Sequence, residues 1–119
     1  VLPPALSQLF GHNPQYIWQA LQQLPTQEAQ FLKAMHSVDA LGVGALAADF
    51  DWATSCSTVV DIGGGNGTFL TTLLRVNPAL RGVLFEVPSA IAQAEACWAD
   101  KHRDLLPRVS FARGDLFDA

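Results

Sequence analysis

Hydrophobic residues in the first part of the chain recur at the three- and four-residue spacing of amphipathic helices. This spacing predicts a helix over residues 14–24, which Pro25 ends because proline cannot continue a helix. Thr26 is expected to cap the N-terminus of the next helix, since its side-chain oxygen suits that position.

The next helical pattern extends from Phe31 to Ala45, again with apolar residues three and four positions apart. Gly42 and Gly44 weaken its second half, so a kink or a break is expected there. Residues 51–57 are then predicted to form a short linker.

From Thr58 onward the pattern changes to short apolar runs that alternate with helical segments. The expected elements are strand, helix, strand, helix and strand, over Thr58–Ile62, Thr68–Val76, Gly82–Glu86, Pro88–His102 and Arg108–Ala112. Apolar strands joined by helices predict a parallel sheet with both faces covered. The fold class is therefore α/β, the first half (βαβαβ) of a Rossmann-like doubly wound parallel sheet preceded by a helical region. We predict a domain boundary between residues 1–57 and 58–119.

Composition narrows the classes of partner. The chain has 119 residues, 50% of them hydrophobic and 15% charged, with a net charge of −4. This balance fits a globular domain and argues against a nucleic-acid partner, which would require a basic face. The most apolar helical stretch, residues 38–50, is too short to cross a bilayer. The two cysteines and three histidines are scattered, so no metal site is expected.

The segment Gly63–Gly67 follows the first predicted strand and holds four glycines in five positions. Backbone without a Cβ can lie against a ligand, and ligands of α/β sheets bind at the carboxyl ends of strands. The dinucleotide pattern G-x-G-x-x-G matches imperfectly, because Thr68 stands where the third glycine should fall. Asp61, just before the loop, would repel a pyrophosphate but suits a ligand that carries an ammonium group.

Four segments carry a resemblance to a known family. Val59–Gly67 resembles the first motif of class I S-adenosylmethionine-dependent methyltransferases, and its triple glycine is similar to plant caffeate-type and bacterial polyketide-tailoring small-molecule O-methyltransferases. Arg81–Pro88 resembles the family's second motif and Gly114–Phe117 its third. Phe31–Met35 resembles the helix that the family places over the cofactor. The likeness covers residue 26 to the end of the chain.

The resemblance implies that S-adenosylmethionine is bound by residues of all four segments: Asp61, Gly63, Gly65, Glu86, Val87, Asp115, Leu116 and Met35. Asp61 would orient the ammonium, the two glycines would lie against the methionine portion, and Glu86 would accept the ribose hydroxyls. Val87, Asp115 and Leu116 would contact the adenine.

Three of these assignments keep alternatives. An acid such as Glu86 also suits a dinucleotide and does not discriminate between the two cofactors. Asp115 could belong to a simple Gly-Asp turn, and Met35 could be an ordinary packed residue of its helix.

The family's general base is a histidine downstream of the third motif, so no catalytic residue is assigned and His36, in mid-helix, receives no catalytic role. The chain is expected to be a fragment of a cytoplasmic, homodimeric O-methyltransferase acting on a small aromatic or polyketide-like hydroxyl, with residues 1–57 in dimerisation and substrate capping. No nucleic-acid, membrane or metal partner is expected. An NAD(P)-binding oxidoreductase half-domain and a non-catalytic dimerisation module remain open.

Overall fold

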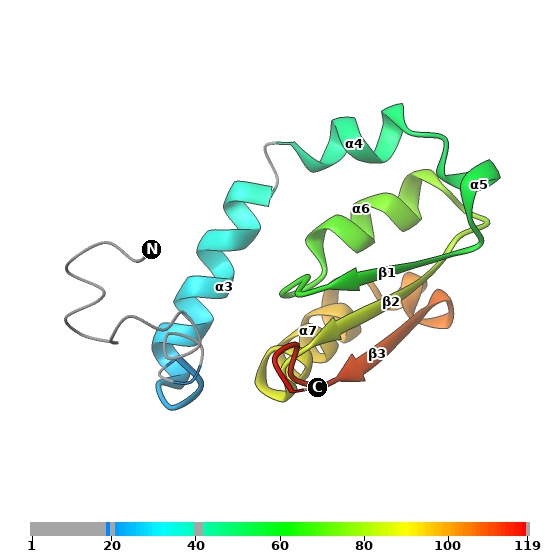
Figure 1. Ribbon diagram of the computed structural model, residues 1–119. Helices are drawn as coiled ribbons and strands as arrows, with labels where there is room; N and C mark the ends of the chain where they lie inside the picture. The colour runs from blue at the N-terminus through cyan, green and yellow to red at the C-terminus, as the bar shows by residue number, and fades with distance from the viewer. Residues whose placement is uncertain (1–18, 20, 40–41, 119) are drawn as a thin grey trace. The chain divides into compact units, whose positions relative to one another are not determined.

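The computed structural model describes Gln19, residues 21–39 and residues 42–118 (Figure 1). The chain divides into two compact units, Val1–Lys33 and Ala34–Ala119. Most of the helix predicted over residues 14–24 lies outside the described residues; within it, Gln19, Leu21 and Gln22 are helical.

The next helix, α3, covers Pro25–Asp39, so the prediction that Thr26 caps it is wrong. Proline fits the first helical position because its fixed φ is already helical and its missing N–H has no partner to lose there. The Leu24 carbonyl accepts the first helical hydrogen bond, from the Glu28 amide at 2.9 Å. Thr26 is therefore inside the helix rather than at its cap.

The expected break in the long helical pattern is confirmed. α3 ends at Asp39, and a separate helix, α4, covers Val43–Asp49 with Gly42 at its N-cap. The predicted linker contains one further helical turn, α5 (Trp52–Ser55), where the Asp51 side chain accepts a hydrogen bond from the Thr54 amide. An acid at this position satisfies an amide that the turn leaves without a helical partner.

The second unit is built on a parallel sheet whose strands follow the order β1-β2-β3 (Figure 1). The strands are β1 (Thr58–Ile62), β2 (Arg81–Glu86) and β3 (Val109–Arg113), and the connecting elements are α6 (Thr68–Val76), α7 (Pro88–Lys101) and the 3-10 helix η1 (Arg103–Arg108). The predicted fold class is confirmed, and η1 is the connecting element between strands that was not expected. In the register of the sheet, Asp61 pairs with Leu84 and Glu86 with Arg113.

A single hydrophobic core joins α6 and α7 to one face of the sheet. Its fully buried members include Leu70, Leu73 and Leu74 of α6, Leu84 of β2, and Trp98 of α7. The prediction that helices cover both faces is wrong for the described residues. Right-handed crossovers that step in one direction from β1 to β3 place both helices on the same face. Helices reach the second face only where later strands are added in the opposite direction.

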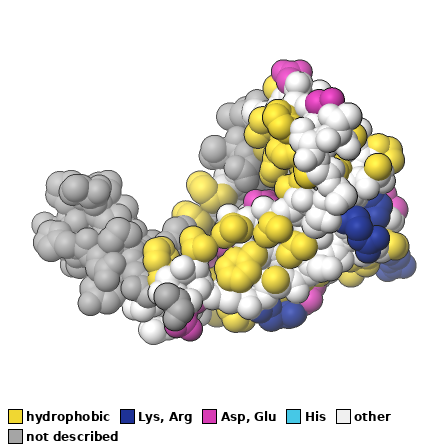
Figure 2. All heavy atoms as spheres, turned by 45° about the vertical axis from the view of Figure 1, so that its right-hand side comes forward, with side chains coloured by type: hydrophobic (Ala, Val, Ile, Leu, Met, Phe, Trp, Pro, Cys, Tyr) yellow, Lys and Arg dark blue, Asp and Glu magenta, His cyan; other side chains and the backbone are white. Residues whose placement is uncertain are grey.

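The second face of the sheet and neighbouring helices expose hydrophobic side chains. Val60 and Ile62 of β1 are 55% and 57% exposed, because they alternate with inward residues along the strand. Figure 2 shows hydrophobic side chains gathered at the surface of the molecule. Those of the second unit that are more than half exposed are Leu46, Phe50, Val60, Ile62, Val76, Leu116 and Phe117. A surface of this kind is typical of a part that packs against further protein.

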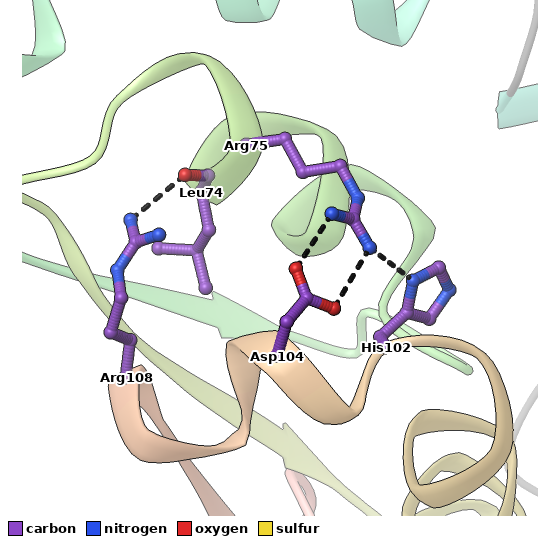
Figure 3. Close-up of polar contacts among 5 residues, drawn as sticks. All are labelled: Leu74, Arg75, His102, Asp104 and Arg108. Atoms are coloured by element: carbon purple, nitrogen blue, oxygen red, sulfur yellow. Dashed lines mark hydrogen bonds and ion pairs between the residues drawn. The ribbon is translucent and has the colours of Figure 1, made fainter.

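A polar cluster ties the C-terminal end of α6 to η1 (Figure 3). The Arg75 guanidinium donates to both carboxylate oxygens of Asp104, at 2.9 and 3.4 Å, and to His102 Nδ1 at 3.1 Å. The hydrogen bond from Arg75 lowers the pKa of the Asp104 carboxyl below its usual value. The pKa of His102 is lowered, mainly by partial burial and next by the positive charge of Arg75. The negative charge of Asp104 acts in the opposite direction.

Arg108 stabilises the same end of α6 (Figure 3). Its guanidinium donates to the carbonyls of Leu80, Leu74 and Asn77 at 3.0, 2.8 and 2.7 Å. These carbonyls lie at or beyond the end of α6, where they have no helical partner, so a positive donor there satisfies them. Because α6 begins at the carboxyl end of β1 and runs back, both arginine clusters lie at the opposite end of the sheet from the glycine loop.

Candidate functional site

The glycine loop Gly63–Gly67 connects β1 to α6 at the carboxyl end of the sheet. Gly63, Gly65 and Gly67 have φ angles of 71°, 60° and 83°, in the left-handed region that side chains disfavour. The Gly63 amide donates to the Phe85 carbonyl at 2.8 Å, so the loop leaves the sheet only after one further bond to β2. The glycines are therefore required by the backbone conformation, and they leave the main chain bare.

Gly64 is required for a different reason, namely the close approach of Asp61. A Cβ on Gly64 would lie 2.5 Å from the Asp61 carboxyl carbon and 2.7 Å from Leu84 Cδ1. The Asp61 carboxylate is thus folded beneath the loop, partly buried, with its Oδ2 atom shielded from solvent. The sequence placed Asp61 at this loop, and the structure brings its carboxylate against the loop backbone.

Glu86 reaches the same loop from the end of β2. A Cβ on Gly63 would lie 3.8 Å from Glu86 Oε1, so this carboxylate and Gly63 are neighbours. The second carboxylate oxygen accepts the amide of Val87 at 3.2 Å, and Val87 is the N-cap residue of α7. The acid at the end of β2 is therefore held half-buried beside the first glycine of the loop.

The loop after β3 lies at the same carboxyl edge of the sheet. The Gly114 amide donates to the Glu86 carbonyl at 3.1 Å, and a Cβ on Gly114 would lie 2.6 Å from the Phe85 ring. The Asp115 carboxylate accepts the Phe117 amide at 2.9 Å in a local turn, and Leu116 is 64% exposed. The turn interpretation of Asp115 thus has a structural basis, while its position at the strand end also fits a ligand role.

Asn66, Thr68 and His36 form a polar contact that the sequence did not predict. The Thr68 hydroxyl donates to Asn66 Oδ1 at 2.8 Å and is hydrogen-bonded to His36 Nδ1. His36 lies in the part of α3 that belongs to the second unit, next to Met35, whose side chain is 39% exposed. The sequence held one hint of this contact: Asn66 is the single residue between Gly63 and Gly67 that has a side chain with which to make it.

The assembled site is acidic and rich in exposed backbone. Asp61 and Glu86 approach the glycine loop, and Arg113, at the end of β3, is paired with Glu95 at 2.5 Å. Such a site suits a ligand with positive charge and hydroxyl groups better than one with phosphates, for which basic residues are normally required.

No group of three or more His, Cys, Asp or Glu residues in the described part of the chain could hold a metal ion. No helix among the described residues is long and apolar enough to span a membrane.

Comparison with known proteins points to one family. The family model described as "O-methyltransferase domain" matches residues 5–119. The mitomycin biosynthesis 6-O-methyltransferase of Streptomyces lavendulae is 34% identical over 106 residues, which cover 89% of this chain and 30% of the relative. The desmethylxanthohumol 6'-O-methyltransferase of Humulus lupulus is 30% identical, covering 87% of this chain and 27% of the relative.

A solved structure agrees with these matches. The O-methyltransferase NcsB1 from neocarzinostatin biosynthesis, in complex with S-adenosylmethionine and 2-hydroxy-5-methyl naphthoic acid, superposes with a TM-score of 0.82 at 30% identity. The match covers 97% of this chain and 34% of that structure. The chain therefore spans about 30% of the length of the relatives it matches.

Proposed function

Because the chain belongs to the O-methyltransferase domain family, we propose that it binds S-adenosylmethionine at the edge of the sheet formed by the glycine loop and the ends of β2 and β3. The observation that carries this proposal is the acid beneath the bare loop. The Asp61 carboxylate lies where only a glycine at position 64 leaves room for it, and Glu86 stands beside Gly63.

These residues fit the cofactor part by part. Asp61 would attract the α-ammonium group through its charge, and the exposed backbone of Gly63 and Gly65 would lie against the aminoacyl chain. Glu86, on the neighbouring strand, would accept hydrogen bonds from the two ribose hydroxyls. When bound, the cofactor supplies a methyl group activated by a sulfonium centre.

The third strand and α3 would complete the site. Val87, Asp115 and Leu116 follow the ends of β2 and β3, where they could contact the adenine. Asp115 would have to share its carboxylate with the Phe117 amide. Met35, beside His36 on α3, would lie near the sulfonium.

Within a protein of the relatives' length, we propose that this chain takes part in O-methylation of a small aromatic or polyketide-like hydroxyl. The naphthoic acid bound in NcsB1 supports an aromatic acceptor. The protein's contribution to such a reaction is to align the two reactants and to exclude water. No residue of this chain is proposed as the general base. Homodimerisation through the helical region and a cytoplasmic location are part of the same proposal.

Isothermal titration calorimetry of the 119-residue chain with S-adenosylhomocysteine and with NADH tests the cofactor assignment. Asp61→Ala should raise the Kd for S-adenosylhomocysteine at least tenfold, because a charged hydrogen bond contributes about 1.5–3 kcal/mol. Asp100→Ala removes an exposed acid on α7 and serves as the matched control. Preference for NADH would favour the oxidoreductase alternative, and failure to bind either ligand would favour a non-catalytic module.

A further inference from the structure

The glycine loop has one side chain through which the rest of the protein can restrain it. Between Gly63 and Gly67, Asn66 alone carries more than a hydrogen on its Cα. Glycine loses more conformational freedom on ordering than any other residue. If this run of glycines were unrestrained, the entropy cost of ordering it would be met on ligand binding and would weaken the affinity. Contacts made by Asn66 therefore add to the backbone bonds of Gly63 and Gly67 in ordering the loop beforehand.

The main chain of Asn66 is fixed by the core. Trp98 is fully buried, and its indole Nε1 donates to the Asn66 carbonyl at 2.8 Å. The next residue, Gly67, lies so close to the Trp98 ring that a Cβ there would be 2.9 Å from Cζ2. One side of the loop is thus held by α7.

The side chain of Asn66 is held by a different element. Asn66 Oδ1 can only accept, so the Thr68 hydroxyl donates to it at 2.8 Å. A hydroxyl has one hydrogen, and Thr68 must therefore accept from His36 Nδ1. His36 then carries a proton on Nδ1, and the 3.4 Å approach of Asn66 Nδ2 to this atom joins two donors and adds no hydrogen bond.

We propose that His36 is a positioning residue of the cofactor loop: it donates from Nδ1 to Thr68, which donates to Asn66, and this relay orders the loop before the cofactor binds. The inference rests on the proposed function, because it concerns the loop to which the cofactor is assigned. His36 has no role in the chemistry. It acts through Thr68 and Asn66, and it connects the segment that carries Met35 to the N-terminus of α6.

Two pairs of variants test the relay in the 119-residue chain. His36→Leu removes the bond to Thr68, and Thr68→Val removes that bond together with the one to Asn66. His36→Asn keeps an N–H near the place of Nδ1, and Thr68→Ser keeps the hydroxyl. The Kd for S-adenosylhomocysteine should rise about 2- to 10-fold in His36→Leu, as expected for one hydrogen bond, and at least as much in Thr68→Val; it should return toward the wild-type value in His36→Asn and Thr68→Ser. The double variant His36→Leu/Thr68→Val should be no weaker than Thr68→Val alone.

The melting temperature without ligand separates positioning from folding. His36 is exposed, so its substitution should leave the Tm nearly unchanged while the Kd rises. Wild-type affinity in His36→Leu, or losses that add in the double variant, would overturn the inference and leave the proposed function intact. Absence of binding by the wild-type chain would overturn both.

A measurement on the wild-type chain alone gives an independent test. Imidazole ¹⁵N chemical shifts at pH 8 distinguish a protonated Nδ1 from a protonated Nε2. The relay requires the proton on His36 Nδ1, and a signal for the other tautomer would overturn it. The shift should also change in Thr68→Val, because the acceptor of that proton is then lost.

Discussion

Substitution of Gly64 by alanine should damage the site through the Asp61 carboxylate. The added methyl would lie 2.5 Å from the Asp61 carboxyl carbon and 2.7 Å from Leu84 Cδ1. Carbon atoms in contact prefer a separation of about 3.5–4.0 Å, so both neighbours would have to move by about 1 Å. Leu84 is fully buried in the core and cannot move freely.

The expected loss follows from this overpacking. An extra methyl in a well-packed region typically destabilises by about 1–3 kcal/mol, and we expect about 2 kcal/mol for Gly64→Ala. For a domain of this size that loss lowers the Tm by about 8 °C. Displacement of the Asp61 carboxylate should also raise the Kd for S-adenosylhomocysteine about tenfold, which corresponds to about 1.4 kcal/mol.

Urea denaturation and calorimetry measure the two effects, and Gly44→Ala is the matched control. A Cβ on Gly44 would meet nothing within 4 Å. Because Gly44 lies in α4, its replacement should leave the stability unchanged or raise it by up to about 1 kcal/mol. The control therefore separates the effect of the close approach from that of glycine replacement in general.

The double variant Asp61→Ala/Gly64→Ala identifies the cause. Removal of the carboxylate makes room for part of the new methyl, so the combined loss of stability should be smaller than the sum of the two single losses. Additive losses, or a Gly64→Ala chain that melts and binds like the wild type, would refute the close approach of Asp61 to this loop.

Two further predictions concern the polar clusters of Figure 3. The pKa of His102 is lowered by burial and by Arg75, so the native state resists protonation and the free energy of unfolding should fall as the pH drops below about 6.5. His102→Gln should remove this part of the pH dependence in urea denaturation between pH 5 and pH 8. Arg108→Met removes three hydrogen bonds to carbonyls around the end of α6 and should lower the unfolding free energy by about 3 kcal/mol, with partial recovery in Arg108→Lys.

Specific results would contradict these two expectations. An unfolding free energy of His102→Gln that changes with pH as steeply as that of the wild type would show that His102 does not carry the effect. Equal stability of Arg108→Met and the wild type would show that water satisfies the carbonyls as well as the guanidinium does. Equal losses in Arg108→Lys and Arg108→Met would show that the geometry of the fork, and not the charge, is what matters.

The strands and their connecting helices could be predicted because local patterns determine them. β1 and α6 have the bounds that the apolar runs and the loop glycines indicated. β2 and α7 differ from prediction by one residue at one end, and β3 by one residue at each end. The helix break at Gly42 was also foreseen, since glycine lowers helix propensity and the break lies where the pattern weakens.

Features that depend on long-range packing could not be predicted from the sequence. Coverage of the sheet depends on the direction in which strands are added, which hydrophobic periodicity does not encode. The preceding helical residues end before Pro25, as predicted, but Pro25 also begins α3, a second use of the same residue that the prediction of a Thr26 cap missed. The link from His36 to Thr68 joins positions 32 residues apart, and no spacing rule connects them.

The placement of Trp98 gives this protein an optical reporter of its own. The indole is fully buried, lies edge-on to Phe111 with ring centroids 5.5 Å apart, donates to the Asn66 carbonyl, and packs against Gly67 of the glycine loop. Any small rearrangement of that loop alters the polarity around this indole. The chain has three tryptophans, and among the described residues Trp98 is the one placed to report events at the sheet edge through its emission, without a dye or a label.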